Sequence, residues 1–234
     1  MSGKRKSYQQ VSLNFAPNKT PKRAASSTIT KRSRLSEWDS CTQYWELFPA
    51  CVPNERTKHL YTFFTQNVKP VPDKVKMFND EYEEKRLTGV FQREAGSFQY
   101  SGSKKISNGE WPLEVEELAQ IATEKLKQAN QDTWKGVDSS MWKTCFINCY
   151  RGGTDCLGLH RDSDGILDPI ASFSFGATRD FHVRCLESKT TMSRPLSDGD
   201  LLLMFPGMQE LYKHGVPSRS KCKEGRINVT FRCT

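Results

Sequence analysis

The 234-residue sequence predicts an α+β fold in which helices buttress an antiparallel β-sandwich or jelly roll. Three observations favour this class. Helical periodicity precedes Trp142, whereas the sequence after it consists of short apolar stretches punctuated by Gly, Asp, Ser and Pro. Several of these stretches alternate apolar and polar residues, which is the period of a half-buried strand. No long helical pattern interrupts them, and this disfavours a parallel α/β sheet.

The first helical region spans residues 36–68, where aromatic residues recur at helical spacing. Pro49 and Pro53 divide this region into two short helices, and Asn54 is suited to cap the second. The proline-broken stretch 69–76 predicts a loop that enters a strand.

Pro112 opens the clearest helix, which has acidic residues in its first turn and lysines in its last turn, as the helix dipole favours. The residues predicted to face the core are Val115, Leu118, Ala122 and Leu126. The strands predicted further along the chain cover residues 143–150, 171–175, 180–186, 200–205 and 226–233.

The formal net charge is +8, and the basic excess lies in the first 34 residues, which contain nine basic and no acidic side chains. This stretch is poor in large apolar residues and cannot bury enough surface to offset its ordering entropy. We therefore predict a disordered basic arm over residues 1–34 and one domain over residues 35–234. The clusters Lys4-Arg5-Lys6 and Lys31-Arg32-Ser33-Arg34 fit a nuclear localisation signal or a non-specific phosphate contact. A solubilising tail explains the same pattern equally well.

Composition excludes several classes of protein. A hydrophobic content of 36% with 11% aromatic residues excludes a wholly disordered chain. No apolar run approaches the ~18 residues of a membrane span, and no apolar segment follows the basic N-terminus as in a secretory signal. We expect a soluble, intracellular monomer with no membrane partner. The eight cysteines form no C-x-x-C pair, so zinc ribbons are unsupported, and Cys145 and Cys149 are predicted to be buried thiols.

Two of the four histidines stand where a metal site would need them. His160 and Asp162 form an H-x-D motif after a glycine-bearing loop, and alternate residues of an extended segment point to one face. His214 follows the 200–205 strand and its turn. Two histidines and a carboxylate on one face form the facial triad of non-haem Fe(II) oxygenases. Because an H-x-D motif is common, a coincidental placement of these residues stays open on this pattern alone.

The last predicted strand carries a second chemical signal, because its alternate residues form one polar and one apolar face. The polar face comprises Arg226, Asn228, Thr230 and Arg232, and the apolar face comprises Ile227, Val229 and Phe231. Burial of two guanidinium groups is costly unless an anion meets them, and the planar fork of arginine binds carboxylates bidentately. A strand with a solvated polar face is the alternative.

In this combination of motifs the sequence resembles the AlkB family of iron- and 2-oxoglutarate-dependent dioxygenases, and specifically its nuclear DNA-repair members. The resemblance covers residues 77–232. The matching motifs are Asn148-Cys149-Tyr150, His160-Arg161-Asp162, Ser172-Phe173-Ser174-Phe175-Gly176-Ala177 with Arg179-Asp180-Phe181, His214, and the RINVTFR stretch at 226–232. Other 2-oxoglutarate oxygenases share only the triad and one arginine, so the ordered combination is specific.

The resemblance implies a double-stranded β-helix with helices packed outside it, in which His160, Asp162 and His214 hold Fe(II). It also implies that Arg226 binds the distal carboxylate of 2-oxoglutarate. The residues implied to complete that pocket are Asn148, Tyr150, Asn228, Thr230 and Arg232. O2 is the second cosubstrate and ascorbate the supporting reductant. In the implied reaction 2-oxoglutarate becomes succinate and CO2, while an N-methyl group is hydroxylated and lost as formaldehyde.

Substrate contacts are also implied by the resemblance. Phe98, Tyr100 and Ser101 lie where the family places its base-recognition strand and lid, so that an aromatic ring stacks on a flipped base. Asp164 is suited to accept a hydrogen bond from the exocyclic amine of adenine or cytosine. Two core aromatic residues on an ordinary strand are the alternative for Phe98 and Tyr100.

Met77-Phe78-Asn79 falls where the duplex-repair members carry an apolar finger that fills the gap left by the flipped base. Phe78 would be the wedge, and Arg86 with nearby lysines would contact phosphates. The acidic continuation over residues 80–84 departs from the family finger and would repel phosphate. Duplex preference therefore stays open, and a core position is the alternative for Phe78.

These features predict a nuclear oxidative demethylase that acts on N-methylated bases in DNA, chiefly 1-methyladenine and 3-methylcytosine. An RNA demethylase or another 2-oxoglutarate oxygenase on the same core, and a catalytically silent nucleic-acid-binding module, are the alternatives. The intact ligand set argues against the silent module. Residues 10–15 resemble a sliding-clamp docking peptide, but Ala16 and Pro17 stand where its paired aromatic residues belong, so clamp docking is a minor expectation.

Overall fold

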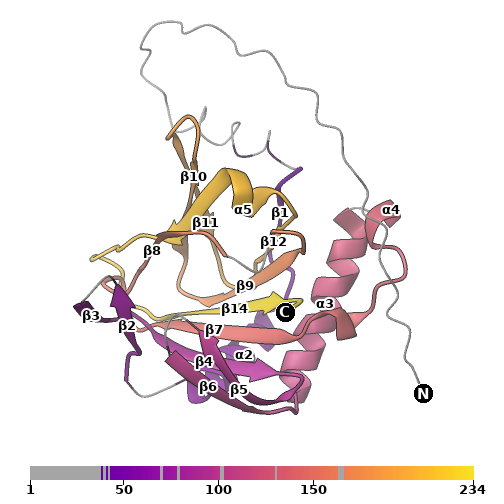
Figure 1. The fold of residues 1–234 in the computed structure, drawn as a ribbon, viewed down its shortest axis with the longest axis horizontal. Coiled ribbons are helices and arrows are strands. Elements are labelled where there is room, and N and C mark those ends of the chain that lie inside the picture. The colour runs from indigo at the N-terminus through magenta and orange to yellow at the C-terminus, as the bar shows by residue number, and fades with distance from the viewer. Residues whose placement is uncertain are drawn as a thin grey trace, which may run out of the picture.

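A computed structural model describes residues 38, 41, 43–68, 71–77, 80–100, 103–129, 131–162 and 166–234 (Figure 1). The predicted arm over residues 1–34 lies outside these residues. Two antiparallel sheets form the body of the domain, and two helices pack outside the larger sheet. This arrangement confirms the predicted jelly roll with buttressing helices.

The larger sheet has six antiparallel strands. In spatial order they are β1 (Trp45–Phe48), β12 (Leu201–Met204), β9 (Ile170–Gly176), β14 (Arg226–Arg232), β7 (Thr144–Tyr150) and β4 (Leu87–Gln92). β14 pairs with β9 on one side and with β7 on the other. Its apolar residues Ile227, Val229 and Phe231 are buried in the cluster that also contains helix residues. The polar row of β14 must therefore face away from the helices, because successive side chains of a strand point to opposite faces.

The smaller sheet has four antiparallel strands. In spatial order they are β11 (Thr191–Leu196), β10 (Arg179–Cys185), β13 (Tyr212–Val216) and β8 (Leu157–His160). Phe181 and Val183 of β10 are buried in a second apolar cluster, together with Tyr150 and Met204 of the larger sheet. Two separate hairpins are formed by β2 (Lys74–Met77) with β3 (Asp80–Glu83), and by β5 (Ala95–Tyr100) with β6 (Ser103–Asn108).

Helices α2 (Asn54–Gln66) and α3 (Leu113–Ala129) supply the outer layer of the larger sheet. Shorter elements are α4 (Gln131–Trp134), the 3-10 turn η1 (Ser139–Met141) and α5 (Met208–Leu211). The four residues predicted to face the core from α3 are all fully buried. The indole N–H of Trp142 donates to Thr123 Oγ1 at 3.0 Å and fastens α3 to the chain that enters β7. In the part of the chain that the structure describes, no helix has the length and apolar content needed to cross a membrane.

The five predicted strands are all present, and each observed end lies within one residue of its predicted position. All eight cysteines are free, and Cys145 and Cys149 are buried thiols as predicted. Burial raises the pKa of both thiols.

The prediction of a first helix in the region 36–68 is wrong. Residues Trp45–Phe48 instead form β1, the edge strand beside β12. Aromatic residues suit strands as well as helices, and the edge of β12 offers backbone partners, so tertiary pairing overrides local spacing. The second predicted helix is α2, but Asn54 does not cap it, because Pro53 occupies the N-cap position. The sequence pattern also misses β4, β8, β11 and β13, which are short and contain Gly or Pro.

Gly153 lies in the turn after β7, where its N–H donates to Cys222 O at 2.9 Å and its carbonyl accepts from Arg219 N at 2.6 Å. A Cβ on Gly153 would clash with the Arg219 carbonyl oxygen. We therefore expect Gly153→Ala to lower the free energy of unfolding by more than about 2 kcal/mol. Gly152→Ala is the control, because its Cβ would lie 3.6 Å from Lys223 O, and it should cost less than about 1 kcal/mol. Urea unfolding measures both, and equal losses would contradict the argument.

Candidate metal and co-substrate site

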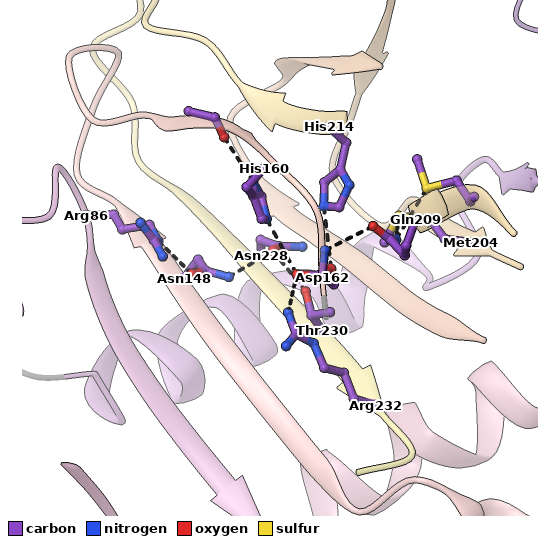
Figure 2. A network of polar contacts seen from close by, with 12 residues as sticks. Arg86, Asn148, His160, Asp162, Met204, Gln209, His214, Asn228, Thr230 and Arg232 are labelled. Carbon is purple, nitrogen blue, oxygen red and sulfur yellow. Dashed lines mark hydrogen bonds and ion pairs between the residues drawn. The ribbon is translucent and has the colours of Figure 1, made fainter. Parts of the chain in front are cut away.

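The three predicted metal ligands meet at the inner edge of the smaller sheet (Figure 2). β8 and β13 pair in a register that sets His160 directly opposite His214, with imidazole centroids 4.4 Å apart. Asp162 Oδ1 lies 3.5 Å from His160 Nε2, and its Oδ2 lies 3.5 Å from His214 Nε2. The three ligand atoms all lie within 4.8 Å of one another. Strand pairing thus assembles a site from residues 54 positions apart in the chain.

The donor set and its orientation fit Fe(II). Two imidazole nitrogens and one carboxylate on one side of a centre leave further positions open, which is the arrangement of non-haem Fe(II) oxygenases. The Nδ1 of His160 lies 2.9 Å from the Gly158 carbonyl oxygen, and this contact leaves Nε2 directed at the centre. Phe181 stacks on His214 with centroids 5.4 Å apart and fixes the second ring. The described residues hold no other cluster of three such side chains with comparable geometry.

The electrostatics of the cluster hold Asp162 and His214 in metal-binding protonation states. Burial alone would raise the pKa of Asp162, but its hydrogen bond to His160 and the Arg232 charge outweigh burial and hold that pKa well below its ordinary value. Arg232 Nη2 donates to Asp162 Oδ1 at 2.6 Å. Burial lowers the pKa of His214 to about 3, against the opposing pull of Asp162. An ionised carboxylate and a neutral imidazole are the forms that ligate a metal.

The polar face of β14 lies inside the protein, which excludes the alternative of a solvated strand face. The exposed fractions are 2% for Arg226, 8% for Asn228, 7% for Thr230 and 6% for Arg232. Arg226 Nη2 donates to Ser174 Oγ at 2.8 Å, and its guanidinium lies 5.3 Å from the ring centroid of Tyr150. Arg226 Nε and Nη1 have no hydrogen-bond partner among the described residues, and burial lowers the pKa of this arginine. Buried donors left open in this way fit the carboxylate of a dicarboxylic acid such as 2-oxoglutarate.

A chain of buried amides connects the polar row to the neighbouring strands (Figure 2). Arg86 Nε donates to Asn148 Oδ1 at 2.8 Å, and Asn148 Nδ2 donates to Asn228 Oδ1 at 3.2 Å. Thr230 Oγ1 donates to the same oxygen of Asn228 at 3.1 Å. Asn228 Nδ2 donates in turn to Ser172 Oγ at 2.8 Å. Each amide is thus held in one orientation, which pre-organises the pocket wall.

A cavity of about 40 Å³ lies between the two sheets at this point. Its lining includes every predicted metal and co-substrate residue except Arg226, which lies beside the lining residue Tyr150. The volume is close to that of one water, which is smaller than a dicarboxylate. A larger cavity of about 790 Å³ lies between α2 and residues 219–225 and contains none of the predicted site residues.

The structure places Arg86 where a phosphate cannot reach it. Its side chain is 5% exposed and pairs with Glu84 Oε1 at 3.2 Å while holding Asn148. This burial speaks against the predicted phosphate contact, because a surface contact needs an exposed cation. The remaining predicted substrate residues lie outside the described part of the structure: Phe78, Ser101 and Asp164 entirely, and Phe98 and Tyr100 in their side chains.

Several site residues are missed by the sequence reasoning. Ser172 and Ser174 alternate with Phe173 and Phe175 in β9, so the strand period could have assigned both serines to the polar face. Gln209 had no such signal. It accepts a hydrogen bond from the Asp162 backbone N–H at 3.1 Å, but it belongs to the single-turn helix α5, which is too short for a periodic pattern.

Comparison with known proteins agrees with this geometry. The model of the 2OG-Fe(II) oxygenase superfamily matches residues 46–232. The human protein named DNA oxidative demethylase ALKBH2 is 36% identical over 113 residues, which cover 44% of this chain and 43% of the relative. The RNA replication polyprotein of Apple stem pitting virus (isolate PA66) is 29% identical over 152 residues, which cover 64% of this chain and 6% of the polyprotein.

The solved structure described as "The structure of OsALKBH1" aligns with a TM-score of 0.56 and 18% identity, covering 80% of this chain and 97% of that chain. At this identity the alignment shows the fold alone. The chain spans less than half the length of the ALKBH2 relative that it matches. The family model, by contrast, covers the domain from β1 to the end of β14. The chain therefore belongs to the 2OG-Fe(II) oxygenase superfamily, and its motifs and relatives make it an AlkB-type member of that superfamily.

Proposed function

We propose that this protein is an Fe(II)- and 2-oxoglutarate-dependent dioxygenase that demethylates 1-methyladenine and 3-methylcytosine in DNA. One observation carries the proposal: a buried site holds three metal-binding side chains beside a polar row in which Arg226 keeps two donor atoms open. That combination suits an oxygenase that binds a dicarboxylate next to its metal. DNA is proposed as the substrate because the human relative is named a DNA oxidative demethylase.

Each residue of the site has a distinct role in this proposal. His160, Asp162 and His214 hold Fe(II), which when bound supplies the activation of O2. Arg226 binds the distal carboxylate of 2-oxoglutarate, and the Tyr150 ring beside its guanidinium fixes the angle of approach. The residues that complete the pocket are Asn148, Asn228, Thr230 and Arg232.

The proposed reaction consumes one 2-oxoglutarate and one O2 for each methyl group. One oxygen atom enters succinate as CO2 leaves, and the other enters a C–H bond of the N-methyl group. The resulting N-hydroxymethyl group breaks its C–N bond, so that formaldehyde leaves, the C–N electron pair returns to the base nitrogen as its lone pair, and the hydroxyl proton is released to water.

The methylated base is proposed to approach from the side of His160. The His160 side chain is 32% exposed, whereas those of Asp162 and His214 are each 6% exposed. A base that enters from this side must leave its stack, and side chains of the pocket must hold it by stacking and hydrogen bonds. The residues proposed to do so are Phe98, Tyr100, Ser101 and Asp164, with Phe78 filling the gap left in a duplex.

The test is the release of formaldehyde and succinate from purified full-length protein. The reaction contains Fe(II), 2-oxoglutarate, ascorbate and 1-methyladenine oligonucleotides, single-stranded and duplex, and His160→Ala serves as the inactive control. Release of both products by the wild type alone would support the proposal. Succinate without formaldehyde would mean an oxygenase with a different substrate, and no turnover of 2-oxoglutarate would overturn the enzymatic role.

RNA is a second candidate substrate because the viral RNA replication polyprotein matches a larger share of this chain than ALKBH2 does. The same assay with matched 1-methyladenine RNA and DNA strands separates the two substrates. A higher kcat/KM on the RNA strand would replace DNA by RNA in the proposal.

The basic residues 1–34 are proposed to serve nuclear import and phosphate contact. We expect deletion of residues 1–34 to weaken DNA association at physiological salt, because these residues carry the entire basic excess of the chain. Turnover on a short, saturating oligonucleotide should survive the deletion. Fluorescence anisotropy across a salt series and the formaldehyde assay measure the two effects. Loss of turnover at saturation would contradict this separation, because it would place the arm in the active site.

A further inference from the structure

The single-turn helix α5 carries a buried amide beside the metal cluster. Gln209 is 2% exposed and lies five residues before His214, on the segment that runs directly into β13. Figure 2 shows its side chain reaching across to Asp162. Neither the metal triad nor the co-substrate row contains it.

The two ends of this amide have unequal partners. Gln209 Oε1 accepts a hydrogen bond from the Asp162 backbone N–H at 3.1 Å. Its Nε2 faces only the sulfur atoms of Met208 at 3.4 Å and Met204 at 3.9 Å among the described residues. Thioether sulfur is a weak acceptor, so the nitrogen end is poorly compensated for its burial. A leucine or methionine would fill the same space without that cost, and the advantage of glutamine must lie in the bond to Asp162.

A second contact ties the same region to α5. Gly207, at the N-cap of α5 with φ of 89°, donates its N–H to Ile166 O at 3.4 Å. The chain is therefore held by α5 at Asp162 and again four residues further on. Only glycine adopts this backbone angle at little cost, so a side chain at position 207 would strain the start of α5.

We propose that Gln209 is a positioning residue of the metal centre. It fixes the backbone of Asp162 so that the carboxylate lies between His160 and His214, and it couples the Asp162 turn to the segment that carries His214. The inference rests on the proposed metal site and adds a residue that sets its affinity. Groups that orient metal ligands from outside the ligand set usually change affinity by about 10- to 100-fold when they are lost.

Gln209→Met is the test variant, because methionine keeps the length of the side chain and removes the strong acceptor. Anaerobic titration of the full-length protein with Co(II), followed by the absorption of the bound ion, should show about 10- to 100-fold weaker binding. Met208→Leu is the matched control, because it removes the sulfur beside Nε2 and leaves the Oε1 bond intact. This control should bind Co(II) like the wild type.

Hydrogen exchange of the Asp162 amide provides a second measurement that needs no metal. Exchange in the metal-free protein should be faster in Gln209→Met than in the wild type or in Met208→Leu. Unchanged Co(II) affinity in a folded Gln209→Met variant would overturn the proposal, and so would equal losses in both variants, which would indicate packing alone. Failure of the wild type to bind Co(II) would instead overturn the metal site itself, and the role of Gln209 with it.

Discussion

Asparagine in place of Asp162 is expected to abolish 2-oxoglutarate turnover and to remove the stabilisation that a bound metal gives the wild type. The carboxylate lies between both histidines and is the only charged ligand of the described cluster. Its loss should weaken Co(II) binding by more than about 100-fold, beyond what loss of an orienting group causes. Thermal unfolding with and without Co(II) measures the effect, because a ligand that binds only the native state raises Tm.

Asp162→Asn should also destabilise the metal-free protein, by about 3–5 kcal/mol. The substitution removes the ion pair at 2.6 Å that offsets the burial of the Arg232 guanidinium. The double variant Asp162→Asn with Arg232→Met should regain much of that stability and none of the metal binding. Asp180→Asn on β10 is the control, and it should keep both the stability and the Co(II) binding of the wild type. Normal Co(II) binding by Asp162→Asn would refute the assigned ligand set.

Methionine in place of Arg226 is expected to change stability and co-substrate binding in opposite directions. Arg226 is fully buried, and two of its donor nitrogens have no partner among the described residues. Replacing an incompletely paired buried charge by an apolar side chain of similar length usually stabilises, here by about 1 kcal/mol or more. Binding of 2-oxoglutarate should weaken by at least about 100-fold, because each hydrogen bond to a charged group contributes about 1.5–3 kcal/mol.

Calorimetric titration of 2-oxoglutarate into the Co(II)-loaded protein and thermal unfolding of the metal-free protein measure the two effects of Arg226→Met. Arg184→Met is the control, because Arg184 is exposed on β10, outside the site. A fall in both stability and affinity would mean that Arg226 is a structural residue whose buried charge is already compensated within the protein. A rise in stability with unchanged affinity would move the carboxylate site elsewhere in the pocket.

The sequence predicts the part of the site that follows from strand period and residue chemistry. The alternation in residues 226–232 separates a polar from an apolar face, and the structure confirms both faces. The pairing of His160 with His214 is less predictable, because it depends on the register of β8 and β13, two short strands that contain glycine. Residue chemistry predicted His160 and His214 as candidate ligands, although the secondary-structure pattern did not predict β8 and β13.

The errors have a common physical origin in tertiary contacts. Trp45–Phe48 becomes a strand because β12 offers it an edge, and no local pattern encodes that partner. The sequence suggests that Arg86 is a surface cation, but in the structure its buried side chain pairs with Glu84 and donates a hydrogen bond to Asn148. Gln209 acts through a backbone N–H 47 residues away, which composition and spacing cannot reveal.

The two faces of β14 have a consequence for inheritance. Ile227, Val229 and Phe231 are packed into the core on the helix side, while Asn228 and Thr230 between them line the cavity of the candidate site. One strand therefore separates the two layers, because one of its faces packs into the core and the other lines the candidate site. A substitution in α2 or α3 that shifts β14 also shifts Arg226 and its neighbours, although the substituted residue does not contact them. Mutational drift in the outer helices is thus exposed to selection on catalysis, and the two layers must evolve together.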